Sequence, residues 1–274
     1  MVLEILVNPT KVRGRPWEMF FIGIVYSLVG VLLGYWVFKS HVSLVMVAFT
    51  AIAAIPFVHS AIKAEEGREV DRKNASVLIK YFGVLTMFTF LFLGFVVTFV
   101  SLFVLLPEQT VTQIFSTQVG AIGEVRSNVT GNFFSTVSTL AVILANNLKV
   151  LFFCLLFSVV YGAGAIFILS WNASVMGAAI GDAIRGKLLG NAGTALQIVS
   201  ASLAGYFVHG IPEIIAYFAG GLAGGVLSVA LVQEKFQSEG LKKAWKDCLN
   251  LTAFAALLLF FAGLIEVYIS PTLL

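Results

Sequence analysis

The sequence predicts an all-α, polytopic integral membrane protein with about seven hydrophobic segments. The chain has 274 residues, of which 59% are hydrophobic and only 11% are charged, whereas soluble domains carry roughly 25% charged residues. The mean hydropathy is +0.98, and apolar runs of about 20 residues, the length that crosses a bilayer as a helix, recur along the chain. A sizeable separate soluble domain is therefore excluded. The formal net charge of +3 is too small to indicate nucleic-acid binding.

The apolar runs divide the chain into three parts. Residues 1–106 are predicted to form an N-terminal unit of three membrane helices, which are Trp17–Phe38, Val42–Ile62 and Tyr81–Leu106. Residues 107–147 are more polar and are expected to form an extracytoplasmic loop, followed by a helix that either is amphipathic or is short and buried. Residues 148–274 are predicted to form a C-terminal membrane core, with apolar runs at Leu148–Ser170, Thr194–Val232 and Cys248–Ile269.

The run Thr194–Val232 is too long for one crossing. Its 39 residues would extend about 58 Å as a helix, whereas the hydrocarbon core is about 30 Å thick. Gly210 gives backbone freedom, and Pro212 suits the first turn of a new helix. We therefore expect a break near residue 210, made either by a hairpin of two crossings or by a re-entrant pair of half-helices.

The distribution of basic residues predicts the orientation. If the N-terminus is cytoplasmic and Thr194–Val232 enters and leaves on the same side, 14 of the 17 Lys and Arg residues lie on the cytoplasmic side, as the positive-inside rule requires. The C-terminus is then outside. Residues 171–193, which carry Asn172 and Asp182, are expected to be either a re-entrant element or an interfacial helix on the cytoplasmic side.

Polar residues of three segments are predicted to lie at similar depth near the outer face. They are Asn146, Asn147, His209, Glu213 and Glu266. Ionisable groups within membranes usually face the protein interior and pair with one another. Three interpretations remain open: a polar clasp that holds the helix break, an ion or proton site, and a catalytic or metal site. The sequence contains no zinc signature, and we expect no catalytic residue, metal or cofactor.

Glycines at a spacing of about four residues predict helix packing. Small residues at this spacing let the backbones of membrane helices approach closely. The candidate positions are Gly162, Gly164, Gly177, Gly181, Gly210, Gly220, Gly221, Gly224 and Gly225. The contacts could be made within one chain or between copies in an oligomer.

The segments 143–181 and 208–225 together resemble the stage II sporulation protein M family. The shared features are an Asn-Asn pair, Gly-x-Gly within a helix, an Asn followed by a Gly, and His-Gly-x-x-Glu followed by a Gly-rich helix. They correspond here to Asn146, Asn147, Gly162, Gly164, Asn172, Gly177, His209, Gly210, Glu213, Gly220, Gly221 and Gly224. The resemblance covers roughly residues 130–232. It implies a multi-spanning membrane protein, similar in spore-forming bacteria to a scaffold that recruits wall-degrading enzymes, and it implies no catalytic residue.

The sequence thus favours a non-enzymatic scaffold or assembly protein of the plasma membrane. Its expected partners are the bilayer and either copies of itself or other membrane proteins. The alternatives are a channel or secondary transporter, in which His209 and Glu213 line an ion or proton path, and an intramembrane hydrolase.

Overall fold

The fold is entirely helical over the residues described by the computed structural model, which are 15–66, 77–130, 136–161, 164–190, 193–235 and 238–270. Seven helices are long and apolar enough to cross a membrane. They are α3 (Glu18–Val37), α4 (Val42–Glu66), α5 (Val77–Leu105), α8 (Thr136–Tyr161), α9 (Ala165–Leu189), α10 (Ala195–Gln233) and α11 (Glu239–Tyr268). The predicted class, an all-α polytopic membrane protein with seven hydrophobic segments, is confirmed.

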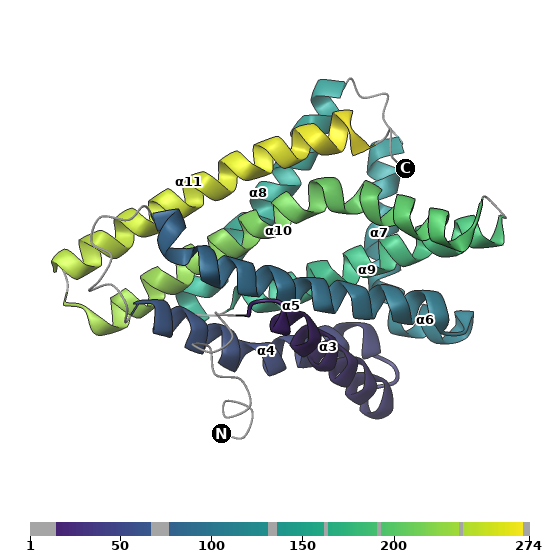
Figure 1. The fold of residues 1–274 in the computed structure, drawn as a ribbon, viewed down its shortest axis with the longest axis horizontal. Helices are drawn as coiled ribbons and strands as arrows, with labels where there is room; N and C mark the ends of the chain where they lie inside the picture. Colours follow the sequence, from purple (N-terminus) through teal and green to yellow (C-terminus); the bar gives the residue numbers. More distant parts are fainter. Residues whose placement is uncertain are drawn as a thin grey trace.

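The long helices run alternately in opposite directions and pack side by side (Figure 1). Helix α9 lies in the centre and contacts α4, α5, α8 and α10, while α3 packs on α4 and α5. Helix α11 packs against α10 and α8 on the other side of the bundle. The C-terminal half of the chain is therefore joined to the N-terminal half mainly through α9.

The predicted break near residue 210 is wrong, because α10 is a single helix of 39 residues with Pro212 inside it. Pro212 has no N–H, so the carbonyl group of Val208 loses its bond within the helix. The helix arches along its length in Figure 1, as expected where a proline interrupts the hydrogen bonding. A full break would leave several more backbone groups without partners, which is far costlier in hydrocarbon than in water. Gly210 serves a different purpose, since a Cβ there would lie 2.8 Å from the terminal methyl of Met176 on α9.

The helix does break one segment earlier, between α8 and α9. The predicted run Leu148–Ser170 is split there, and residues 171–193, which were expected to form a re-entrant element or an interfacial helix, belong largely to the candidate span α9. The N–H of Ala165 donates to the hydroxyl of Ser158 at 3.1 Å, so a side chain satisfies one free donor of the new helix. A Cβ at Gly164 would collide with the carbonyl of Phe157. Gly162 lies outside the described residues.

Several predicted packing glycines are points of close approach within one chain. Gly177 and Gly181 of α9 face Phe99 and Phe103 of α5, and Gly220 of α10 faces Leu151 of α8. Gly221 likewise faces Ala165, and Gly224 faces the carbonyl of Leu155 and the side chain of Ser158. Gly225 is also buried.

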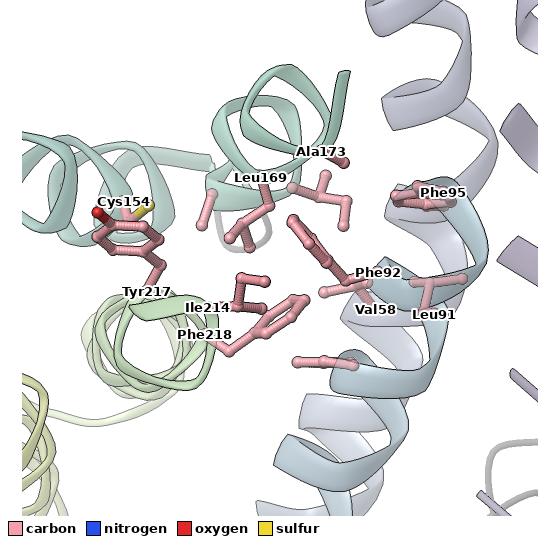
Figure 2. Packing of buried hydrophobic residues seen from close by; sticks show 14 of the residues in the cluster. Val58, Leu91, Phe92, Phe95, Cys154, Leu169, Ala173, Ile214, Tyr217 and Phe218 are labelled. Atoms are coloured by element: carbon pink, nitrogen blue, oxygen red, sulfur yellow. The ribbon is translucent and has the colours of Figure 1, made fainter. Parts of the chain in front are cut away.

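Aromatic and aliphatic side chains fill the space between α4, α5, α9 and α10. Phe92 of α5 and Phe218 of α10 meet edge to face, with ring centroids 6.2 Å apart. Figure 2 shows Leu169 and Ala173 of α9 beside these rings, and Tyr217 beside Cys154. Because Tyr217 and Phe218 are adjacent on α10, the helix presents one side to this core and another to α8.

The described residues between α5 and α8 are also mostly helical. They include α6 (Glu108–Ile114) and α7 (Ser116–Thr130), and α8 then runs across the boundary predicted between residues 147 and 148. The amide of Gln118 on α7 donates to the carbonyl of Ser43 and to the hydroxyl of Ser174, both at 3.0 Å. These bonds join α7 to α4 and α9, so this segment is packed onto the bundle.

The topology of α10 can be tested with single cysteines. In a chain whose Cys154 and Cys248 are replaced by alanine, we expect Leu189→Cys and Glu234→Cys to react with a membrane-impermeant maleimide from opposite sides of sealed vesicles. The reason is that one helix, α10, crosses between the two positions. Labelling of both from the same side would contradict a single crossing and would restore the hairpin.

The glycine contacts predict a selective loss of stability. Gly224→Ala places a methyl group against the backbone of α8, and such overpacking costs about 1–3 kcal/mol of unfolding free energy. Gly120→Ala is the matched control, since a Cβ on this glycine of α7 meets nothing within 4 Å. Thermal unfolding in detergent should show a lower midpoint for Gly224→Ala alone. Equal midpoints would contradict the close approach of α8 and α10.

Candidate functional site

The structure brings part of the predicted polar motif into a hydrogen-bonded chain. The side-chain amide of Asn147 on α8 donates to Oε1 of Glu213 on α10 at 2.6 Å. The hydroxyl of Tyr217, one turn further along α10, donates to Oδ1 of Asn147 at 3.0 Å. Asn147 thus uses both its donor and its acceptor on one neighbouring helix, and it fastens α8 to α10.

Glu266 of α11 completes this group of polar residues. It lies close enough to Glu213 and Tyr217 to interact with both electrostatically. We call Asn147, Glu213, Tyr217 and Glu266 the polar cluster. Since its members come from α8, α10 and α11, the cluster lies where all three helices meet.

His209 lies outside the polar cluster and has a different partner. Its Nδ1 is 2.7 Å from the hydroxyl of Ser270, just beyond the end of α11. The ring also lies near Tyr206, with centroids 6.4 Å apart. Although His209 and Glu213 are four residues apart on one continuous helix, each bonds a different helix: His209 the end of α11 and Glu213 the middle of α8.

The two asparagines of the Asn-Asn pair are not equivalent. Asn147 is 6% exposed, whereas Asn146 lies on the exposed side of α8. Neighbouring residues on a helix point about 100° apart, so only one member of the pair can face α10. Of the two, Asn147 alone belongs to the polar cluster.

The polar cluster lies deeper along α10 than the sequence suggested. Glu213 was expected at an outer turn, but α10 continues for 18 residues before it and 20 after it. Asn147 is likewise inside the candidate span Thr139–Val160. Glu266 nevertheless lies near the end of α11. The hydrogen-bonded members of the cluster, Asn147, Glu213 and Tyr217, therefore lie within the bundle.

The other polar residues singled out in the sequence lie apart from the cluster. Asn172 donates to the carbonyl of Ile168 in its own helix at 2.8 Å. Arg185 donates to the carbonyl of Phe103 at 3.2 Å, which satisfies one of the last carbonyl groups of α5. Asp182 is exposed on α9.

Two partners were missed by the sequence reasoning. Tyr217 follows Glu213 by four residues, and this spacing places both on the same side of a continuous helix. Ser270 offered no signal, because its role depends on where α11 ends against α10.

The chemical capacity of the site is limited by these bonds. Among the described residues, no three His, Cys, Asp or Glu side chains are grouped closely enough to hold a metal ion. A small cavity between α4, α5, α8, α9 and α10 is lined mainly by apolar side chains such as Ile62, Phe88 and Leu169. Neither Glu213 nor His209 lines it.

The fold and the polar cluster together define a class: a polytopic helical membrane protein whose C-terminal helices are joined by buried polar side chains. The family model of stage II sporulation protein M matches residues 85–271, which is more than half of the chain. The chain therefore belongs to the stage II sporulation protein M family.

The family match is wider than the motifs that first indicated it. It begins within α5 and extends just beyond α11, so it includes most of the third membrane helix and Glu266. No curated protein and no solved structure matches the chain.

The Asn-Asn pair provides a matched test of the polar cluster. Asn147→Ala leaves Glu213 and Tyr217 each without a partner, and an unsatisfied buried group costs about 1–3 kcal/mol. Asn146→Ala removes an exposed amide and should change the unfolding free energy by less than about 0.5 kcal/mol. Thermal unfolding of both variants in the same detergent checks the prediction. Equal losses, or a larger loss for Asn146→Ala, would contradict the assigned bonds.

Proposed function

We propose that this protein is a non-enzymatic membrane scaffold or assembly protein. The observation that carries the proposal is the bonding of Tyr217, Asn147 and Glu213, which uses the polar atoms of the family motif to hold α8 against α10. A motif used in this way stabilises a rigid bundle and leaves its outer helix faces for partners. The expected partners are other membrane proteins, which bind to the lipid-exposed faces of these helices.

In this proposal the protein lies in the plasma membrane with its N-terminus in the cytoplasm and its C-terminus outside. Basic residues at 11–15, 63–80 and 235–246 then share the cytoplasmic side, in agreement with the positive-inside rule. Arg185 and Lys187, near the end of α9, fall on the outer side once α9 and α10 each cross once. The chain still crosses the membrane seven times, which is an odd number, so the two termini keep their predicted sides.

A second candidate function is an ion or proton path through the polar cluster. The observation in its favour is the approach of two carboxyl groups, Glu213 and Glu266, inside a bundle of membrane helices. Intramembrane carboxyl groups often mark such paths. Against it stands the direct bond between Glu213 and Asn147, which occupies one of the two carboxyl oxygens that a moving ion would contact.

Hydrolysis is less well supported, although Ser270 and His209 lie at the distance of a nucleophile and its base. The side chain of Ser270 is only 3% exposed, which leaves little room for a substrate. A nucleophile also needs donors for the oxyanion and a third group that orients the histidine. Among the described residues, no carboxylate is hydrogen-bonded to His209.

One substitution separates the scaffold from the ion path. Glu213→Gln keeps the shape of the side chain and removes its charge. If Glu213 only holds the helices together, the protein should lose at most part of its stability and should show no transport. We expect neither the natural protein nor Glu213→Gln to conduct ions in proteoliposomes, and we expect the thermal midpoint to fall in the variant. Ion flux that is present in the natural protein and lost in Glu213→Gln at unchanged stability would overturn the scaffold proposal.

A further inference from the structure

Helix α8 presents polar side chains on its outward face. It is the least buried of the seven candidate spans, since α10, α11 and α9 cover its other sides. The exposed residues of this face are Val142, Ala145, Asn146, Lys149, Phe152 and Leu156. All but Asn146 and Lys149 are apolar, so an amide and an ammonium group lie within a surface that otherwise suits lipid.

Lys149 lies in the middle of its span. The candidate span runs from Thr139 to Val160, so at 1.5 Å per residue the lysine is about 15 Å from either end. Lysines near helix ends extend their stems to the headgroups, but a four-carbon stem is far shorter than this distance. A lipid phosphate is therefore out of reach for the ammonium group.

The described part of the chain offers Lys149 no counter-charge. Over the described part of the chain, no hydrogen bond or ion pair is assigned to this lysine. The nearby carboxyl group of Glu213 bonds Asn147, two residues before Lys149. Two residues correspond to about 200° around a helix, so Lys149 points away from the polar cluster. Unpaired charges of this kind are rare and costly within a bilayer.

A second copy of the chain that packs symmetrically through the same face does not satisfy Lys149 either. Copies inserted in the same direction are related by an axis along the membrane normal, and a symmetric contact of this face places each α8 against the other. The two lysines would then meet, and like charges repel most strongly in a low-dielectric medium. The outward face of α8 is instead suited to a negatively charged neighbour.

We propose that the outward face of α8 binds a transmembrane helix of another protein that carries an Asp or Glu near its middle. The carboxylate of that helix pairs with Lys149, and the amide of Asn146, three residues earlier on the same side of α8, bonds it or the adjoining backbone. Ala145 leaves room for close approach, while Val142 and Phe152 supply apolar contact above and below. The inference rests on the scaffold proposal, since it states the chemistry of the partner that the scaffold holds.

The test uses designed peptides in place of the unidentified partner. Three leucine-rich transmembrane peptides of equal length carry Asp, Asn or Leu at the centre, and their association with the labelled full-length protein is measured by energy transfer in phosphatidylcholine vesicles. We expect the Asp peptide to associate between about threefold and thirtyfold more strongly than the Leu peptide. Lys149→Met should abolish the difference. Lys39→Met, which removes a cation at the end of α3, should leave it intact.

A variant and a peptide with exchanged charges test whether Lys149→Met acts through the lost charge or through an indirect structural effect. Lys149→Glu should bind a peptide with a central Lys more strongly than the Asp peptide, which exchanges the preference of the natural protein. Equal association of the Asp and Leu peptides would overturn the inference. So would energy transfer between copies of the protein, measured in the absence of peptide, if it depends on Lys149. Those results would not overturn the scaffold proposal, which is overturned instead by ion flux that depends on Glu213.

Discussion

The absence of water in the bilayer core is the constraint on which the rest of this structure depends. A backbone N–H or carbonyl group in hydrocarbon must find its partner within the protein. Helix α10 therefore stays continuous through Gly210 and Pro212, two residues that would end many helices in water. Where the chain does turn, between α8 and α9, the hydroxyl of Ser158 accepts the N–H of Ala165 and so compensates one of the lost bonds.

Close packing of the continuous helices follows from the glycines. Because lipid tails are as apolar as leucine, membrane helices associate through van der Waals contact and hydrogen bonds rather than through the hydrophobic effect. Gly220 and Gly224 let α10 approach α8 closely, and that approach also brings Asn147 within bonding distance of Glu213 and Tyr217. The glycine contacts and the polar cluster thus act on the same pair of helices.

The family motif acquires a physical interpretation from this arrangement. Its His and Glu do not form one site, because His209 bonds Ser270 and Glu213 bonds Asn147. They connect α10 to the end of α11 and to the middle of α8, respectively. A bundle fixed at two levels in this way keeps its outer faces in defined positions, as the proposed scaffold function requires.

The sequence by itself determined the membrane class, the number of long apolar helices and the family, and it singled out Asn147, His209, Glu213 and Glu266 as candidate polar residues. These properties follow from composition, run length and residue spacing, which are local. Only the tertiary structure decided that α10 is unbroken, that α9 belongs to the spans, and that Asn147 rather than Asn146 faces Glu213. Those outcomes depend on which neighbour satisfies each backbone and side-chain group, and neighbours distant in sequence, such as Met176 for Gly210 and Ser270 for His209, are set by packing.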